Sequence, residues 1–271
     1  MNGWIYVHNL DPILFEIGPV RVGWYGLMYA LSFLIGYFLL QREARLGRVV
    51  IEPHDVPSVT TYLIVGVVVG GRLGWVIFYG GLPYLIEPIR IVQTWRGGMS
   101  FHGGLIGVLL AIWIFARTRR VSMLSVGDAV VPYVPIGLFF GRIGNFINGE
   151  LWGKPTDGSW GVIFPGDRVH APRHPSQLYE ALLEGVLIFV VLWLIRRQGH
   201  RPGAMPAVFM LLYGLGRSVV EFIRLPDADI GYLWGPITMG HLLSLPLIIV
   251  GSMWVLLLLM THPPQGRAPR R

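Results

Sequence analysis

Polar residues that could bind and act on an anion lie inside or beside long apolar stretches of this chain. The densest group is the run 141–153, which holds one arginine, two asparagines and one glutamate among four glycines. An arginine at the centre of a membrane helix costs about 2.5–3.5 kcal/mol on insertion scales, so its presence needs a reason. Guanidinium groups bind phosphate through paired hydrogen bonds, and glycines let the backbone approach a ligand closely. The run therefore predicts a site for an anionic ligand.

Further polar residues fall near the same ends of the apolar stretches, so we expect them to lie at one depth. Arg217, Glu221 and Arg224 follow one another at spacings of four and three, which place them on one face of a helix. Together with Arg142, they predict a multi-arginine cluster that binds phosphate. The candidate residues outside the cluster are Tyr25, His102, Asn145, Asn148, Glu150 and Gly153.

Simpler structural explanations remain open for several of these residues. Arg217 and Glu221 could do no more than neutralise each other, since buried charges are normally paired. Arg142 could cap loop carbonyls, and His102 could be an ordinary interfacial histidine. Tyr25 and the tryptophans fit the aromatic belt at a membrane surface.

One apolar stretch contains a glycine repeat with an arginine inside it. Gly66, Gly70 and Gly74 have the small-xxx-small spacing that predicts close helix packing in membranes. Arg72 lies between them, and a structural role and a contact with a lipid headgroup are equally compatible with its position.

The composition indicates a polytopic membrane protein. Of its 271 residues, 53% are hydrophobic and 14% are charged, against about 25% charged in a typical soluble domain. The absence of cysteine excludes disulfides, a cysteine nucleophile and a thiolate metal site. The net charge of +7 fits basic loops facing anionic lipid better than it fits a nucleic-acid partner.

Seven stretches approach the roughly 20 apolar residues that a bilayer core requires. The predicted spans are Val22–Leu40, Pro57–Tyr79, Phe101–Ala116, Gly127–Phe146, Gln177–Ile195, Ala204–Ile223 and Met239–Met260. Pro132 and Pro135 are expected to kink the fourth span, and Pro246 the seventh.

The distribution of arginine predicts the orientation of these spans. Arginines cluster on one side, at 42–48, 117–120, 196–201 and 267–271. Short cytoplasmic loops carry an excess of Lys and Arg, so this side is predicted to be cytoplasmic and the N-terminus to lie outside. The fold class is thus all-α, with seven transmembrane helices and a small extracytoplasmic cap.

The chain is expected to form a single membrane domain over 1–260, followed by a disordered basic cytoplasmic tail at 261–271. Extracytoplasmic arms and the cap are predicted at about 1–21, 80–100 and 147–176. The sequence contains none of the motifs of a zinc protease, an α/β-hydrolase nucleophile or a nucleotide-binding loop. Neither a metal nor a cofactor is therefore expected.

Four segments together resemble the bacterial phosphatidylglycerol–prolipoprotein diacylglyceryl transferase family. They are His-Gly-Gly-Leu-Ile-Gly at 102–107, the run 141–153, His-Pro-Ser-Gln-Leu-Tyr-Glu at 174–180, and Arg217-x-x-x-Glu221-x-x-Arg224. The resemblance extends from about Asp11 to the seventh span, and the run 141–153 is its most specific part.

The resemblance implies an enzyme of the bacterial cytoplasmic membrane whose active site faces the extracytoplasmic side. Such an enzyme transfers the diacylglyceryl group of phosphatidylglycerol to the thiol of the lipobox cysteine in a prolipoprotein, and glycerol phosphate leaves. Its implied partners are phosphatidylglycerol, the prolipoprotein signal peptide and the lipid bilayer, with no nucleic acid and no cofactor.

This chemistry needs stabilisation of the leaving phosphate and a thiolate nucleophile. Arg142 and Arg217 are predicted to stabilise the developing charge. His102 could serve as the general base, because histidine exchanges protons near neutral pH. Glu221 or Glu150 could serve instead, or could only orient the arginines.

Substrate binding is assigned to a wider set of residues. These are Tyr25, Arg142, Asn145, Asn148, Glu150, Gly153 and Arg224. The residues alone also permit a transporter or flippase of an anionic phospholipid, in which the arginines would line a path. That alternative predicts polar residues through the whole membrane depth, whereas here only Arg72 lies deep in a span.

Overall fold

The computed structural model describes residues 4–18, 20–81, 84, 86–94, 97–226 and 231–261. Its contacts divide the chain into two compact units. The first unit comprises Met1–Gly36 and Val130–Arg271, and the second comprises Tyr37–Ala129. Apart from Thr261, the predicted tail lies outside the described residues.

Seven helical stretches of the described chain are long and apolar enough to cross a membrane, which confirms the predicted number of spans. They are Trp24–Arg45, Pro53–Gly80, Phe101–Arg119, Met123–Ile147, Ser176–Arg197, Ala204–Glu221 and Met239–Met260. The first runs five residues beyond the predicted end at Leu40, through Arg42 and Arg45. Basic side chains in a last turn are favoured by the helix dipole, so the polar extension remains helical.

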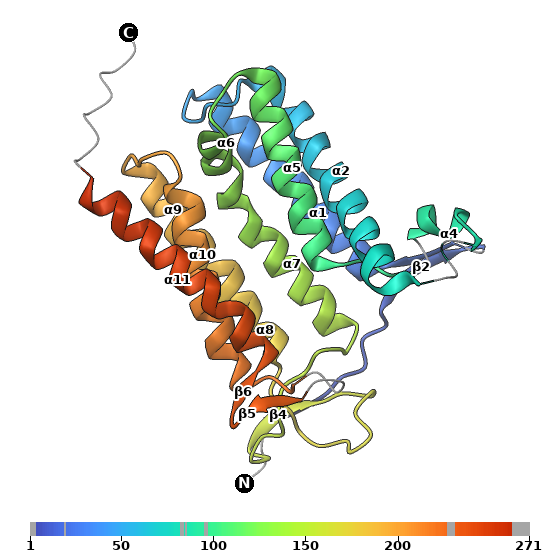
Figure 1. Ribbon diagram of the computed structural model, residues 1–271. Coiled ribbons are helices and arrows are strands. Elements are labelled where there is room, and N and C mark those ends of the chain that lie inside the picture. Colours follow the sequence, from blue (N-terminus) through green and yellow to red (C-terminus); the bar gives the residue numbers. More distant parts are fainter. Residues whose placement is uncertain are drawn as a thin grey trace. The chain divides into compact units, whose positions relative to one another are not determined.

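Close glycine contacts join the two long helices of the second unit. Helix α2 (Val56–Trp75) and helix α5 (Phe101–Arg119) lie side by side (Figure 1). A Cβ on Gly66 would lie 2.6 Å from the carbonyl oxygen of Gly107, and a Cβ on Gly74 would lie 2.7 Å from Cα of Gly103. The predicted close packing of this glycine repeat is therefore confirmed.

Arg72 has a structural role within the second unit. Its side chain donates to several backbone carbonyls, including those of Ile91 (2.8 Å) and Gly98 (2.9 Å), and its guanidinium lies 5.5 Å from the ring centroids of Trp75 and Tyr84. Arg72 is only 4% exposed. Carbonyl groups thus satisfy this buried cation and fasten the segment around helix α4 (Ile89–Val92) to α2.

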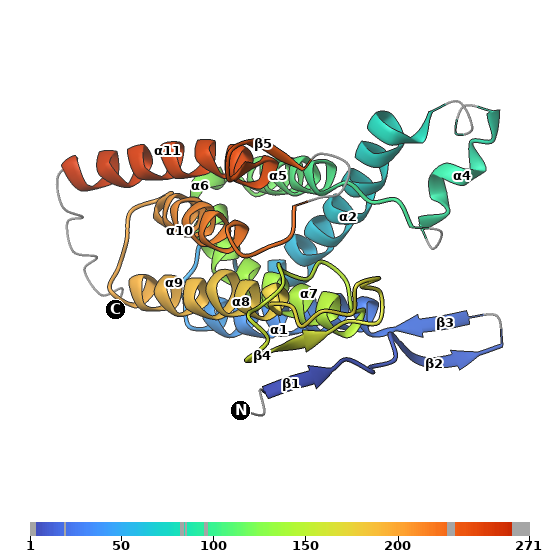
Figure 2. The same cartoon turned by 90° about the horizontal axis from the view of Figure 1, so that it is seen from below.

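The first unit is a helical bundle with the beginning of helix α1 (Trp24–Arg45). Helices α10 (Ala204–Glu221) and α11 (Met239–Met260) lie side by side in both views (Figures 1 and 2). A 3-10 turn containing Pro132 separates helix α6 (Met123–Val130) from helix α7 (Val134–Ile147), at the place where a kink was predicted, whereas α11 continues through Pro246. The other helices of the first unit include α8 (Ser176–Glu180) and α9 (Ile188–Arg197), whereas all of α6 except Val130 belongs to the second unit.

Short strands, which the sequence did not predict, organise the segments between spans in the first unit. Strand β1 (Trp4–Val7) pairs in parallel with β4 (Trp160–Ile163), as Figure 2 shows. Strand β2 (Ile13–Ile17) pairs antiparallel with β3 (Val20–Gly23), and β5 (Tyr232–Trp234) with β6 (Ile237–Thr238). The β1–β4 pair ties the N-terminal segment to the segment that follows α7, and β6 leads directly into α11.

Candidate active site

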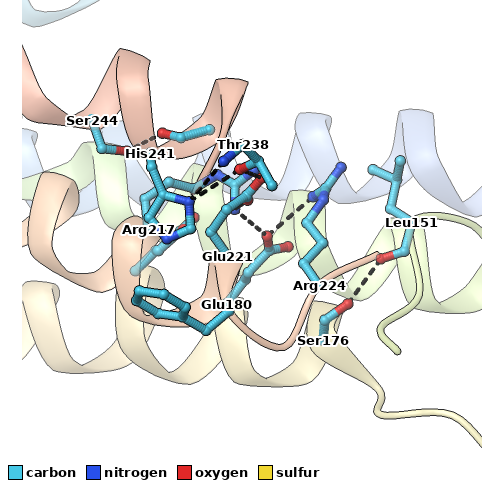
Figure 3. Close-up of polar contacts among 12 residues, drawn as sticks. Leu151, Ser176, Glu180, Arg217, Glu221, Arg224, Thr238, His241 and Ser244 are labelled. Atoms are coloured by element: carbon cyan, nitrogen blue, oxygen red, sulfur yellow. Dashed lines mark hydrogen bonds and ion pairs between the residues drawn. The ribbon is translucent and has the colours of Figure 1, made fainter. Parts of the chain in front are cut away.

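A buried carboxylate joins three arginines in the first unit. One oxygen of Glu180, at the end of α8, lies 3.0 Å from Nε of Arg142. Its other oxygen lies 3.1 Å from Nη1 of Arg224 and 3.5 Å from Nη1 of Arg217. Figure 3 shows Glu180 between Arg217 and Arg224. The predicted gathering of Arg142, Arg217 and Arg224 is therefore observed, and one glutamate holds it together.

Two further glutamates complete the pairing of charges. Nη2 of Arg142 lies 3.5 Å from Oε2 of Glu184. Arg217 forms the expected ion pair with Glu221, one turn further along α10. Three arginines thus contact three glutamates, of which the sequence analysis had paired only Glu221 with an arginine. The carboxylates balance the charge of the cluster and fix where each guanidinium points.

The arginines and the glutamates differ in their access to the surface. The side chains of Arg142, Arg217 and Arg224 are 17%, 15% and 10% exposed. Those of Glu180 and Glu184 are 0% exposed. Because a guanidinium carries five N–H donors, Arg142 and Arg217 can offer donors to a ligand while their glutamate partners are more deeply buried. The arrangement is suited to binding an oxyanion such as a phosphate.

Asn145 links the arginine cluster to Glu150. Its side-chain oxygen lies 3.5 Å from Nη1 of Arg142, and its side-chain nitrogen donates to Oε1 of Glu150 at 2.9 Å. Asn148 donates to the same carboxylate oxygen at 3.2 Å. Glu150 is exposed, unlike Glu180. Four of the predicted residues therefore form one connected polar group around the end of α7.

The loop after α7 is held close to α8. The side chain of Gln177 donates to the backbone oxygen of Glu150 at 2.6 Å, and Ser176 donates to that of Leu151 at 2.9 Å (Figure 3). Ser176 and Gln177 are fully buried, so these bonds are shielded from water. They fix the direction in which the loop leaves the cluster.

Gly153 occupies a position that a larger residue could not take. Its amide donates to the carbonyl oxygen of His174 at 2.8 Å, and the residue forms a β-bridge with Arg224. A Cβ at this position would lie 2.8 Å from that carbonyl oxygen and 3.0 Å from the carbonyl oxygen of Ile223. The expectation that Gly153 keeps the loop close is in accord with these contacts.

A second ion pair, outside the spans, stabilises the same loop. Arg173 donates to both carboxylate oxygens of Asp167, from Nε at 2.6 Å and from Nη2 at 2.8 Å. Both residues are buried. Hydrogen bonding by Arg173 holds the pKa of the Asp167 carboxyl below its usual range. Nη1 of Arg173 also lies 3.5 Å from the carbonyl oxygen of Gly153, so the pair contacts the part of the loop that contains this glycine.

Tyr25 lies against α7 but is not joined to the arginines by a hydrogen bond in the described structure. Its hydroxyl lies 3.3 Å from that of Tyr29. A Cβ on Gly144 would lie 2.8 Å from the ring of Tyr25, so the glycine lets α1 and α7 approach there. His102, near the start of α5, belongs to the second unit; it is exposed, and its ring packs edge-on against Phe101.

Several residues of the cluster received no role from the sequence. Glu180 and Glu184 could have been recognised as an i, i+4 pair of acids inside an apolar span. Thr238 and His241 gave no such signal, yet the hydroxyl of Thr238 donates to Glu221 at 2.5 Å and lies 3.1 Å from Nδ1 of His241. Within the described residues, no group of three or more His, Cys, Asp or Glu side chains is placed to hold a metal ion.

Comparisons with known proteins agree on one family. The family model described as prolipoprotein diacylglyceryl transferase matches residues 12–257. A phosphatidylglycerol–prolipoprotein diacylglyceryl transferase of Solidesulfovibrio magneticus is 49% identical, over 93% of this chain and 96% of that protein. Proteins of the same name from Nitratidesulfovibrio vulgaris strain Miyazaki F and Xanthomonas euvesicatoria are 51% and 48% identical. They cover 92% and 91% of this chain, and 94% and 90% of their own lengths.

Proposed function

The chain belongs to the prolipoprotein diacylglyceryl transferase family, and from this membership we propose how its site performs the transfer. The substrates are phosphatidylglycerol and a prolipoprotein, and the acceptor is the thiol of a lipobox cysteine. Its sulfur forms a bond to the terminal sp3 carbon of the diacylglyceryl group. The bond from that carbon to a phosphodiester oxygen breaks, and its electron pair leaves with glycerol phosphate.

The arrangement of the arginines supports this proposal most directly. Arg142 and Arg217 are partly exposed, and the Glu180 carboxylate that they share is fully buried. We assign to these arginines the stabilisation of charge on the departing phosphate, because donors fixed in advance need no reorganisation as the charge develops. Arg224 binds the same lipid headgroup. Glu180 and Glu184 position the arginines and do not contact substrate.

The other predicted residues bind and orient the lipid. Asn145 presents its amide group beside Arg142, and Asn148 presents its own beside Glu150. Tyr25 contributes its hydroxyl on the neighbouring helix. Gly153 keeps the loop close to the cluster. His102 and Glu150 are the two candidates for the base that accepts the thiol proton. Glu221 is less suitable, because its buried carboxylate is occupied by Arg217 and Thr238.

The protein is a multi-pass membrane protein, and we place it in the bacterial cytoplasmic membrane. The arginine-rich ends of the spans would face the cytoplasm, and the polar site the extracytoplasmic side. The transporter or flippase that the residues alone permitted gains no support from the matched family, and we do not propose it.

The test uses the full-length protein in detergent with phosphatidylglycerol and a lipobox peptide. Peptide mass and glycerol phosphate release are followed together, so that bond formation and bond cleavage are measured in one reaction. We expect diacylglyceryl addition at the cysteine, abolished by Arg142→Ala and retained in Arg168→Ala, which alters an exposed arginine of the same loop region. A folded, lipid-binding protein that changes neither substrate would refute the proposal.

A further inference from the structure

The N-terminal turn of α11 contacts the ion pair of Arg217 and Glu221, although none of its residues was assigned a role. Thr238 caps this helix, and its hydroxyl donates to Oε1 of Glu221 at 2.5 Å. Both side chains are buried, at 2% and 5% exposure. A charge-assisted hydrogen bond shielded from water holds a carboxylate far more rigidly than an exposed one does.

His241 keeps Thr238 in this position. Nδ1 of His241 accepts from the backbone N–H of Thr238 at 3.3 Å, which completes a capping box at the start of α11. The imidazole ring also packs on Phe222, with 4.5 Å between ring centroids. Phe222 directly follows Glu221, so this ring contact packs the end of α10 against the start of α11. Figure 3 shows His241 and Thr238 beside Arg217 and Glu221.

Because Gly240 has no side chain, the carboxylate of Glu221 can pack directly against this turn. A Cβ on Gly240 would lie 2.5 Å and 2.6 Å from the two carboxylate oxygens, so any side chain here would force the carboxylate to move. Ser244 fixes the backbone of the glycine by donating to its carbonyl oxygen at 2.7 Å. The carboxylate therefore sits at the N-terminus of a 22-residue helix, where the helix dipole favours negative charge.

From these contacts we infer that Thr238 and Gly240 are positioning residues for the transfer reaction. They hold Glu221 against α11, and Glu221 in turn orients the guanidinium of Arg217 toward the departing phosphate. The inference rests on the proposed function for its kinetic consequence. Neither residue touches substrate, so the clamp formed by Thr238, Gly240 and Glu221 acts only through Arg217.

This role predicts a specific kinetic signature. Misplacing a catalytic group by about 1 Å can cost up to a hundredfold in rate, and a donor that acts mainly in the transition state affects kcat more than KM. We expect Thr238→Val and Gly240→Ala to lower kcat on the order of tenfold, with the KM for phosphatidylglycerol changing less than about threefold. Thr238→Ser keeps the hydroxyl and should restore most of the rate.

Gly137→Ala is the matched control for Gly240→Ala. Gly137 also lies in a membrane helix of the first unit, but a Cβ there would meet nothing closer than Oγ of Ser32 at 3.9 Å. Its activity should remain close to that of the wild type. Combining Thr238→Val with Arg217→Lys in one protein tests whether the clamp acts through Arg217. We expect less than about a twofold further loss in that background, because the group that the clamp serves is already impaired.

Two kinetic results would overturn the inference. One is a wild-type kcat in Thr238→Val; the other is an equal loss of kcat in the wild-type and Arg217→Lys backgrounds. Thermal unfolding of the same full-length protein gives a readout independent of transfer. Thr238→Val and Glu221→Gln should lower the unfolding temperature non-additively, since the first removes the hydrogen bond between these residues and the second removes the charge that strengthens it. Strictly additive shifts would disprove the clamp. Non-additive shifts in a protein without transferase activity would refute the proposed function alone.

Discussion

Glu180 is the residue whose change should reveal most about how the arginines are held. Its two oxygens contact Arg142 at 3.0 Å, Arg224 at 3.1 Å and Arg217 at 3.5 Å. Glu180→Gln keeps the size of the side chain but replaces one oxygen with an NH2 group. That group is a donor, and every arginine nitrogen facing it is also a donor. At least one guanidinium must then lose its partner and turn away.

The size of the effect follows from these contacts. Loss of one preorganised donor group from a site that stabilises an oxyanion costs about 10²–10³ in rate. We therefore expect Glu180→Gln to lower kcat/KM about a hundredfold, or roughly 2.7 kcal/mol. In the described structure, Glu184 forms an ion pair with only one of the three arginines, Arg142, at 3.5 Å. Glu184→Gln should accordingly lose about tenfold or less.

The assay is diacylglyceryl transfer from phosphatidylglycerol to a lipobox peptide, measured at several lipid concentrations. Thermal unfolding in the same detergent separates loss of fold from loss of positioning, and Glu184→Gln provides the matched acid in the same span. A Glu180→Gln enzyme with more than half of the wild-type kcat/KM would refute the reasoning. So would a Glu184→Gln enzyme that is the more impaired of the two while both remain folded.

Four further predictions address other parts of the site. Arg142→Lys should lose most activity, because lysine keeps the charge but not the paired donor geometry, and near-normal transfer would remove bidentate binding from the mechanism. If His102 is the base, His102→Gln should alter the acidic limb of the pH–rate profile; an unchanged limb would exclude it. Gly153→Ala should lower activity and the unfolding temperature together, since its Cβ meets the carbonyl oxygens of His174 and Ile223, whereas unaffected thermal unfolding would show that the loop can adjust. The lowered pKa of Asp167 means that its pair with Arg173 stabilises the fold fully above the unfolded-state value of about 3.9 and is lost as the pH falls through the lower folded value. The unfolding temperature of Asp167→Asn should therefore depend less on pH in this acidic range than that of the wild type, and identical pH profiles would count against the pair.

The spans were predictable from sequence because membrane insertion imposes a strong and simple constraint. About 20 apolar residues must follow one another, and the helix Met239–Met260 begins and ends where that rule predicted. The small-xxx-small spacing of Gly66, Gly70 and Gly74 was equally informative, since only glycine permits the contact with α5. Both features depend on local spacing, which a single sequence records directly.

The pairing within the site could not be predicted in the same way. Glu180 belongs to α8, but its partners come from α7, from α10 and from the turn after α10. Thr238 reaches Glu221 only because α10 and α11 lie side by side. Such contacts depend on how helices pack, and no spacing along the chain encodes them. Arg72 was ambiguous for the same reason, because its backbone partners Ile91 and Gly98 lie 19 and 26 residues away.

The balance of charge in the cluster bears on turnover as well as on folding. Three unpaired arginines would be costly to bury and would hold the glycerol phosphate product as firmly as the transition state. Arginines that bind a phosphate equally tightly before and in the transition state lower KM without raising kcat. Pairing each arginine with a buried glutamate reduces the positive field that any bound phosphate meets, while it fixes the remaining N–H donors in direction. Stabilisation of the transition state then depends more on how these N–H donors fit the departing phosphate than on the net charge of the cluster. We therefore expect Glu180, which contacts all three arginines, to matter for kcat although no contact with substrate is assigned to it.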